Sequence, residues 1–431
     1  MMMSSRDVAR RVLQRVDEGA YATLALAGEL QRARGLAPAD RGLATELTYG
    51  VLKRRRRLDF ALARFAPRGI DKLDARVLDA LRIGAYQILF LRVPAHAAVD
   101  DAVEAIKRLR SPKLAGFANA VLRSLAREGE PEPPSEPRAK LAIVESAPDW
   151  LVNDAMARFD ADEAQRYLAS LNAPAPLWLR ANSLRATRDE AMRAVAADRP
   201  DATLSPSEVV AEAFRVEGAG DISTLAAFSA GLVTAQDVAA QRIARMVDPK
   251  PGERILDGCA GVGGKSTHLA ALSGDGAHID AADLSERKLD LGTDLARRLG
   301  VTSLNAIRCD LTDPRAPLAD AYDRVLLDAP CSGLGVLRRH PEAKWRRAPD
   351  DAQALSELQA RMLAAMAPRV RPGGVLVYSV CTYSDEEGPR QLERFLAAHP
   401  SFRVDGELLR TWPHRDDADG FFAVRMLRAI E

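Results

Sequence analysis

The sequence predicts a multidomain protein with an all-α N-terminal domain, a small α+β middle unit and an α/β doubly wound, Rossmann-like C-terminal domain. Residues 5–128 carry apolar side chains at helical spacing, residues 128–140 are rich in proline and charge, and from about residue 237 short apolar strands alternate with helical segments. With 431 residues, the chain is long enough for about two to three domains.

The N-terminal domain, expected over residues 1–130, is predicted to be helical because apolar residues recur on one face of successive segments. In "RDVARRVLQRV", for example, Val8, Val12 and Val16 lie on one face of a helix. This domain carries 24 Lys and Arg against 15 Asp and Glu, a net charge of +9, although the whole chain has a net charge of +1. The excess of positive charge predicts that this domain meets a polyanion.

A linker is expected over residues 131–140, inside the stretch "EGEPEPPSEPRAK", which lacks apolar periodicity. Residues 141–236 mix helical segments such as "APDWLVNDAMARF" with the strand-like "PLWLRANSL". We therefore expect a small α+β unit there, which connects the domains or binds RNA, with a topology that the pattern does not define.

The C-terminal domain, residues 237–431, alternates strands with helices. The expected strands are "ERILDGC", "GAHIDAADLS", "LNAIRCD", "YDRVLLDAP" and "GGVLVYSVC", and "GFFAVRML" is expected as a last, antiparallel strand. Alternation of this kind predicts a doubly wound sheet, which binds its ligands at the carboxyl ends of the strands.

A Gly-rich turn and two acids follow the first three of these strands. The turn "DGCAGVGGKS" joins the first strand to its helix, and its glycines allow the backbone to approach a ligand closely. Asp283 ends the second strand, where an acid can bind a ribose, and Asp310 ends the third, near the expected adenine. Together they predict a nucleoside cofactor. The Walker spacing is missing, which favours S-adenosylmethionine or a dinucleotide over ATP.

Two cysteines follow the fourth and fifth strands, which are expected to be neighbours. Cys331 and Cys381 would then open into the cofactor crevice. A thiolate that adds to C6 of a pyrimidine makes C5 nucleophilic, so that C5 can take a methyl group. Asp328 would assist by hydrogen bonding at N3 or at the exocyclic amine, and the base must leave its stack to reach the pocket. Alternatively, a cysteine can serve as a small buried hydrophobic side chain, which is the favoured interpretation for Cys259 and Cys309 taken alone. A redox pair of Cys331 and Cys381 is a further alternative, which the missing CxxC spacing disfavours.

Several classes of protein are disfavoured. The N-terminus has no apolar core of a signal peptide, and charged residues interrupt every apolar run before it could span a bilayer. Four cysteines without paired spacing favour free thiols in a reducing cytoplasm, and six scattered histidines argue against a metal site. We expect a cytoplasmic monomer without a metal ion.

Long stretches resemble the RNA cytosine-5 methyltransferases of the Sun/Fmu type. They are "SAGLVTAQDVAAQRIARMVDPKPGERILDGCAGVGGKSTHLA", "DAPCSGLGVLRRHPEAKW" and "GGVLVYSVCTYSDEEG". The N-terminal "VPAHAAVDDAVEAIKRL" and "GFANAVLRSL" resemble the RNA-binding antitermination factor NusB. The combination, over nearly the whole chain, is similar to bacterial enzymes that methylate C5 of a cytosine in 16S rRNA. It implies a NusB-like first domain, S-adenosylmethionine as methyl donor and 16S rRNA as partner.

The resemblance also implies roles for individual residues. The nucleophile falls on Cys381, Cys331 is implied to assist release of the product, and Asp328 joins both the catalytic and the cofactor-binding residues. The implied cofactor contacts are Cys259, Ala260, Gly261, Val262, Gly263, Gly264, Lys265, Asp283, Asp310 and Asp328. The sequence departs from the family's usual pattern at Gly261 and Val262, where Ala and Pro are common, and at Gly388, where Asn is frequent.

Two groups of basic residues are candidates for contacts with the RNA. Lys53–Arg57 is the densest basic run, and a second group follows Cys331, comprising Arg338, Arg339, Lys344, Arg346 and Arg347. We expect phosphate contacts from both groups, with a solvated charged face as the alternative. Trp345 is either an anchor of the substrate loop or part of the core.

Three rival functions stay open at this point. The catalytic motifs alone would also suit a tRNA methyltransferase. A DNA cytosine-5 methyltransferase would use Cys331 as its nucleophile, but the second cysteine and the NusB-like helices argue against it. An idle methyltransferase fold that serves as an RNA-binding assembly factor would not need the intact Gly-rich loop, Asp283, Asp328 and both cysteines.

Overall fold

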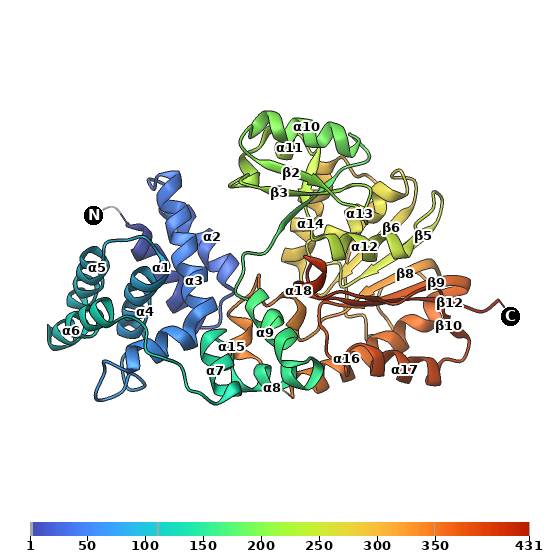
Figure 1. Cartoon of the computed structure of the whole chain (residues 1–431). Coiled ribbons are helices and arrows are strands. Elements are labelled where there is room, and N and C mark those ends of the chain that lie inside the picture. The colour runs from blue at the N-terminus through green and yellow to red at the C-terminus, as the bar shows by residue number, and fades with distance from the viewer. Residues whose placement is uncertain (1–2, 110–111, 349, 431) are drawn as a thin grey trace. The chain divides into compact units, whose positions relative to one another are not determined.

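The computed structural model describes residues 3–109, 112–348 and 350–430. Contacts within the chain divide it into two compact units. The first contains residues 1–174 together with 337–348, and the second contains residues 175–336 and 349–431. Figure 1 shows both, coloured along the chain.

The first unit is helical because its apolar residues recur at helical spacing and bury one face of each helix. Its core is built from fully buried side chains such as Val8, Leu47, Leu81 and Leu122. The helices are α1 (Ser5–Asp17), α2 (Ala22–Arg32), α3 (Pro38–Ala63), α4 (Ala75–Phe90), α5 (Ala95–Arg108), α6 (Pro112–Glu128), α7 (Pro137–Val144), α8 (Asp149–Arg158), α9 (Ala161–Ser170) and α15 (Ala343–Arg346). The predicted all-α N-terminal domain is confirmed.

Residues 137–174 lie elsewhere than the sequence analysis placed them. Helix α7 begins inside the expected linker, and α7, α8 and α9 belong to the first unit rather than to the middle unit. The local cause is a helix start: the Glu136 carboxylate accepts hydrogen bonds from the backbone N–H groups of Arg138 (3.0 Å) and Ala139 (2.6 Å), and Pro137 occupies the first helical position. The same proline and charge had suggested an unstructured linker.

The second unit begins with a small antiparallel sheet, in the order β2-β3-β1-β4. Its hydrophobic side is formed by Leu179, Val195, Phe214 and Val216, all buried. The elements are β1 (Leu177–Ala181), α10 (Arg188–Asp198), β2 (Thr203–Pro206), β3 (Ala213–Glu217), η1 (Ile222–Thr224), α11 (Ala226–Ser229) and β4 (Val233–Ala235). This is the predicted α+β unit, whose topology the sequence left open.

The larger sheet has the order β10-β12-β9-β8-β5-β6-β7, with β11 paired to β12. Neighbours from β9 to β7 are parallel, whereas β12 is antiparallel to β9, as predicted for the last strand. The strands are β5 (Arg254–Gly258), β6 (His278–Asp283), β7 (Leu304–Arg308), β8 (Tyr322–Asp328), β9 (Val370–Val380), β10 (Phe402–Val404), β11 (Leu409–Arg410) and β12 (Phe422–Arg428).

Helices cover both faces of this sheet, as a doubly wound fold requires (Figure 1). On one face α12 and α13 bury Ile255, Leu326 and Val377; on the other α16 and α17 bury Leu256 and Leu376. The helices are α12 (Val238–Val247), α13 (Gly264–Leu272), α14 (Glu286–Leu299), η2 (Leu334–Val336), α16 (Asp351–Met366), η3 (Ala367–Arg369), α17 (Pro389–Ala398) and α18 (Pro413–Asp416).

The order of strands fixes where a ligand can bind. The chain runs from β5 through β6 to β7 in one direction and then returns to form β8 on the other side of β5. The register pairs Gly258 with Leu327, and Asp328 with Ser379, so the carboxyl ends of β5, β8 and β9 lie side by side. This reversal is the topological switch point, the usual ligand site of such sheets.

Candidate active site

Cys331 and Cys381 lie side by side at the carboxyl edge of the large sheet. Cys331 follows β8 and Cys381 follows β9, and because these strands are parallel neighbours their Sγ atoms are 3.2 Å apart. The Gly335 N–H donates to the Cys381 carbonyl at 3.0 Å, which joins the two loops. Both cysteines are half-buried free thiols, so the structure brings together the two residues that the sequence singled out.

The surroundings of Cys331 favour its neutral form. The hydrogen bond between the thiols, together with burial, raises the pKa of Cys331 well above its usual range. Cys331 is therefore a neutral thiol at neutral pH, and its S–H group can donate to the Cys381 sulfur. A neutral thiol in this position can stabilise negative charge that develops on the neighbouring sulfur during a reaction.

Asp328 lies beside the cysteines and is held from two directions. Lys265 Nζ lies 2.5 Å from Asp328 Oδ2, and Ser379 Oγ donates to Asp328 Oδ1 at 2.7 Å. Burial disfavours the charged lysine, but the adjacent carboxylate outweighs this effect and raises the pKa of Lys265. The ion pair fixes the carboxylate while leaving each oxygen one further lone pair for a substrate. The sequence analysis missed Ser379, although its position two residues before Cys381 could have identified it.

The Gly-rich turn between β5 and α13 follows a path that favours glycine. Gly261 and Gly263 have φ angles of +59° and +77°, in the left-handed region. A Cβ atom at Gly263 would lie 3.0 Å from Gly292 Cα on α14, so the loop packs directly on that helix. Cys259 shares the left-handed conformation, with φ of +62°, although it is not glycine. Strain of this kind is typical of binding loops.

Acidic residues surround the turn. Asp283 accepts hydrogen bonds from the N–H groups of Gly261 (3.0 Å) and Ser285 (2.8 Å), so it braces the loop at the end of β6. Asp257 is fully buried, and burial raises the pKa of its carboxyl group to about 7. Its Oδ2 accepts from Ser266 Oγ at 2.6 Å, whereas its Oδ1 has no hydrogen-bond partner among the residues that the structure describes. The sequence analysis gave Asp257 no role.

The third acid is arranged differently. Asp310 is exposed in the turn after β7, and its Oδ1 accepts from the Thr312 N–H (2.8 Å) and hydroxyl group (2.7 Å). It caps that turn and remains at the carboxyl edge of the sheet. The positive-φ loop, the acids at three strand ends and the unpaired buried oxygen of Asp257 fit a nucleoside that carries a cationic group.

The basic residues after Cys331 do not form the expected RNA grip. Within the first unit, Lys344 is 1% exposed, and its Nζ donates to the Lys53 carbonyl (2.7 Å) and to Asn172 Oδ1 (3.1 Å). Trp345 Nε1 donates to the Leu52 carbonyl at 2.8 Å, which makes it an anchor within this unit. The prediction for Lys344 is wrong because a buried ammonium group that serves two acceptors is not available to phosphates.

The side chains next to Lys344 also form hydrogen bonds with backbone groups of the first unit. The Arg346 guanidinium donates to the carbonyls of Val16, Gly19 (3.2 Å) and Ala20 (2.8 Å) at the end of α1, where a helix leaves carbonyls unpaired. The Glu342 carboxylate accepts from the Ala22 N–H at 3.0 Å, the start of α2. Arg346 is nevertheless exposed, so its predicted phosphate contact stays a prediction. Arg338 is buried, whereas Arg339 and Arg347 are half-buried, and their predicted phosphate contacts stay untested.

The basic run Lys53–Arg57 is also occupied within the first unit. Lys53 Nζ donates to the Ala173 carbonyl at 2.7 Å, and burial lowers the pKa of Lys53 to about 8. Arg57 makes a two-pronged ion pair with Glu130, at 2.6 and 2.7 Å. Arg56 binds the Ala147 carbonyl (2.8 Å) and Asp149 (2.7 Å). These contacts tie α3 to the chain at 130–173, so three side chains of the run are engaged within the unit, and the predicted contact of the run with RNA stays a prediction.

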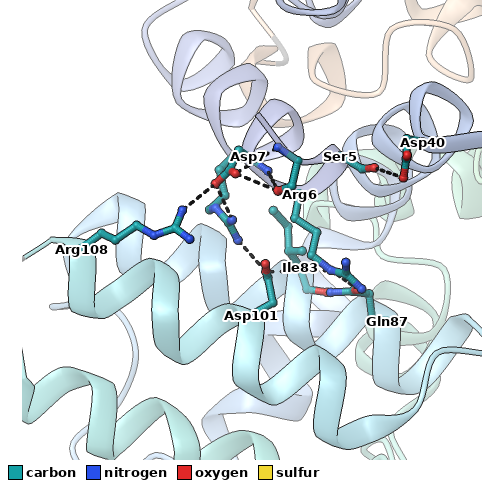
Figure 2. Close-up of polar contacts among 10 residues, drawn as sticks. Ser5, Arg6, Asp7, Asp40, Ile83, Gln87, Asp101 and Arg108 are labelled. Atoms are coloured by element: carbon teal, nitrogen blue, oxygen red, sulfur yellow. Dashed lines mark hydrogen bonds and ion pairs between the residues drawn. The ribbon is translucent and has the colours of Figure 1, made fainter. Parts of the chain in front are cut away.

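Exposed positive charge instead gathers on α1, α4 and α5, near the polar contacts of Asp7 that Figure 2 shows. Asp7 accepts from Arg10 (2.8 Å) and Arg108 (3.3 Å), and Arg10 also donates to Asp101 at 2.7 Å. A hollow of about 370 Å³ opens here, whose basic lining residues are Arg10, Arg11, Arg76 and Arg108. The side chains of Arg11, Arg76 and Arg108 are 57%, 54% and 51% exposed. The sequence did not reveal this cluster, because its members are distant along the chain.

Two classes of feature are absent from the residues that the structure describes. No helix there is long and apolar enough to cross a membrane. In the same residues, no group of three or more His, Cys, Asp or Glu side chains is arranged to hold a metal ion.

Comparisons with known proteins agree with this architecture. The family of 16S rRNA methyltransferases RsmB/F matches residues 244–427, the NusB family matches residues 3–127, and the ferredoxin-like domain of RsmF/B-like methyltransferases matches residues 147–223. Among solved structures, the crystal structure of the protein PH0851 covers 98% of both chains with a TM-score of 0.85 and 26% identity. A methyltransferase homologue from Pyrococcus horikoshii, 24% identical, shares the fold over 68% of this chain and all of its own, with a TM-score of 0.59.

Two full-length relatives show the family. A protein of Synechocystis named "Probable ribosomal RNA small subunit methyltransferase B" is 35% identical over 99% of this chain and 100% of its own length. The "Ribosomal RNA small subunit methyltransferase B" of Yersinia pseudotuberculosis is 31% identical over 98% of both chains. The chain belongs to the RsmB/F family of 16S rRNA methyltransferases, which take S-adenosylmethionine as methyl donor.

Proposed function

We propose that this protein transfers a methyl group from S-adenosylmethionine to C5 of a cytosine in 16S rRNA, with Cys381 as the nucleophile and Cys331 as the residue that assists release. The observation that carries the proposal is the 3.2 Å separation of two thiols at the ends of adjacent strands, beside the Lys265–Asp328 ion pair. The names of the full-length relatives support rRNA as the substrate. The reaction would take place in the cytoplasm, as expected from the free thiols.

The residues at the switch point fit the cofactor. The loop from Cys259 to Lys265 and the start of α13 would cradle it, Asp283 is suited to its ribose, and Asp310 lies where the adenine would be expected. Asp257 lies beneath the loop, where it accepts a hydrogen bond from Ser266 at the start of α13. When bound, S-adenosylmethionine supplies the electrophilic methyl group that the base receives.

The protein's own groups then act on the base in a defined order. The Cys381 thiolate adds to C6 of an unstacked cytosine, which moves electron density to C5. Asp328, fixed by Lys265 and Ser379, accepts a hydrogen bond from the exocyclic amine. After C5 has gained its methyl group, the C5 proton passes to water, the C5=C6 double bond re-forms and the C6–S bond breaks. The departing Cys381 thiolate accepts a hydrogen bond from the neutral Cys331 thiol, so the enzyme returns to its starting state.

The rRNA would be held in part by the cluster on α1, α4 and α5. Arg11, Arg76 and Arg108 keep about half of their side chains exposed around one hollow. Guanidinium groups placed in this way suit the phosphates of a folded RNA, whose shape rather than its bases they would contact. The net charge of +9 on residues 1–130 favours the same partner.

The decisive experiment compares wild type with Cys331→Ser and Cys381→Ser, using methyl-labelled S-adenosylmethionine and naked 16S rRNA. Methyl transfer and the protein–RNA adduct on a denaturing gel are both followed. We expect Cys331→Ser to accumulate adduct and Cys381→Ser to form neither adduct nor product. Cys309→Ser, a buried cysteine after β7, is the matched control and should behave as wild type.

Other outcomes would change the proposal in defined ways. An adduct trapped by Cys381→Ser would make Cys331 the nucleophile, as in the DNA-type alternative. If wild type labels tRNA and not 16S rRNA, the substrate class is wrong. If wild type labels no RNA, naked or within a ribosomal particle, while it still binds the cofactor, the protein is an assembly factor rather than an enzyme.

A further inference from the structure

One buried carboxylate next to the two cysteines has no place in the reaction described above. Glu387 follows Cys381 by six residues, in the loop between β9 and α17, and is 0% exposed. Glutamate is rarely buried completely unless its carboxylate is paired or hydrogen-bonded. The groups that surround it therefore indicate what it does.

Three donors converge on the Glu387 carboxylate. The Ser332 N–H donates to Oε1 at 2.8 Å, the Ser332 hydroxyl group donates to Oε2, and Gln359 Nε2 lies 3.1 Å from Oε1. Ser332 and Gln359 are themselves buried. Each of these three groups donates, and a carboxylate is the side chain that can accept several hydrogen bonds at once. Two of these bonds end on the residue that directly follows Cys331.

The same network reaches the other side of Cys331 and the neighbour of Cys381. Gln359 Nε2 also donates to the Pro330 carbonyl at 2.9 Å, so Cys331 is flanked on both sides by residues tied to Glu387 or to its partner. The Ser332 hydroxyl oxygen is 2.8 Å from Thr382 Oγ1, directly after Cys381. Tyr378 OH, on β9, lies 2.6 Å from the Glu387 carbonyl. The position of each sulfur is thus set by one buried group of side chains.

We propose that Glu387 is a positioning residue, whose carboxylate holds the loop of Cys331 through Ser332 and so keeps the Cys331 thiol aimed at the Cys381 sulfur for the release step. This inference rests on the proposed function, because release is a step of that reaction. Glu387 acts through Ser332 and through its charge, and it does not touch the base.

The electrostatics agree with the geometry. After the hydrogen bond to Cys381 and burial, the negative charge of Glu387 is a further cause that raises the pKa of Cys331. A carboxylate nearby disfavours a second negative charge. Without it, the pKa of Cys331 would be raised less, and the Cys331 loop would lose its bonds through Ser332.

The first test separates release from the earlier steps. Glu387→Gln keeps the shape of the side chain and removes its charge, and Glu386→Gln is the matched control, because Glu386 is the adjacent carboxylate and pairs with Arg390 and Arg394 on α17. We expect Glu387→Gln to form adduct and transfer the first methyl group normally, to slow later turnovers by about tenfold or more, and to accumulate adduct. Glu386→Gln should match wild type in all three.

The second test does not depend on activity. In a Cys381→Ser background, the rate at which iodoacetamide alkylates Cys331 is measured against pH by peptide mass spectrometry. We expect Glu387→Gln to move the alkylation profile of Cys331 to lower pH and Glu386→Gln to leave it unchanged. Ser332→Ala keeps the charge of Glu387 and removes one bond, so it should slow release with a smaller shift of the profile. Ser332→Ala also tests the inference if the Glu387→Gln protein does not fold.

The outcomes are distinguishable. If the alkylation profile does not move and no adduct accumulates, Glu387 only stabilises the fold and the inference is overturned. If first turnover and release fall equally, Glu387 acts before release and the inference is again overturned. If wild type forms no adduct at all, the proposed function fails, whereas a shifted profile would still assign Glu387 its effect on Cys331.

Discussion

Functional residues were predicted from the sequence in two regions, the carboxyl edge of the large sheet and the basic segments of the first unit. The structure agrees with the sequence prediction much better in the first region than in the second. At the sheet edge, Cys331, Cys381, Asp328 and Lys265 were singled out from separate motifs and lie together. In the first unit, the run at 53–57 was singled out for its charge and is bound to carbonyls and carboxylates of the same unit.

The difference follows from what fixes the position of each side chain. Parallel strands end at one edge, so a residue just after a strand is placed by topology before any side-chain contact is known. A basic residue on a helix has no such constraint, and any nearby helix end offers unpaired carbonyls to it. Arg346 at the end of α1 is the clearest case. Motifs at strand ends therefore predict sites better than runs of charge do.

The largest effect is expected at the sheet edge, from Asp328→Asn. The change keeps the shape of the side chain but removes the charge that pairs with Lys265 and the acceptor proposed for the exocyclic amine. We expect methyl transfer to fall by about 10²- to 10⁴-fold, the range for a group that assists the chemistry directly. Single-turnover rates at saturating S-adenosylmethionine would measure it, with Asp290→Asn, on the exposed side of α14, as control. An unchanged rate would remove Asp328 from the mechanism.

A smaller effect, on stability rather than activity, is expected from Lys344. Burial lowers the pKa of Lys344 in the folded protein to about 7, whereas its ordinary value is 10.5. Between these values the unfolded chain holds the proton and the folded protein does not, so the free energy of unfolding rises with pH, by up to about 1.4 kcal/mol per unit. Lys344→Met should abolish that rise.

Denaturant unfolding of wild type and Lys344→Met at several pH values from 7 to 9.5 would test this. The difference in stability between the two proteins should grow with pH in favour of wild type. Lys72→Met, at an exposed position of the same unit, should show no such trend. If the difference between wild type and Lys344→Met does not change with pH, the Lys344 ammonium group is hydrated and available to RNA. The sequence prediction for this basic segment would then be as good as the prediction for the sheet edge.

Much of the fold could be predicted, since the strands from β5 to β9 and the antiparallel β12 follow from apolar runs bounded by turns. Contacts within the chain group α7 to α9 with the first unit, although the sequence pattern grouped them with the middle unit, because local periodicity does not define packing between helices. Glu387 was quoted within its motif but given no role, since only the folded chain brings it to Ser332. Departures from the family pattern also have local reasons: a Cβ at Gly388 would lie 3.1 Å from the ring of Phe422.

The smallest effect distinguishes the two kinds of arginine in the first unit. Arg108 keeps 51% of its side chain exposed and lies 3.3 Å from Asp7 in the hollow of Figure 2, whereas Arg57 is held by Glu130 through two short bonds. Arg108→Gln should lower the salt dependence of rRNA binding by about one phosphate contact, a change in slope of about 0.7 to 0.9, without changing stability. Arg57→Gln should leave that slope unchanged and lower stability by about 1 kcal/mol. Filter binding over a salt series and thermal unfolding measure both variants. If Arg57→Gln lowers the slope and Arg108→Gln does not, the basic run holds RNA after all, and charge density along the sequence would have been the better guide.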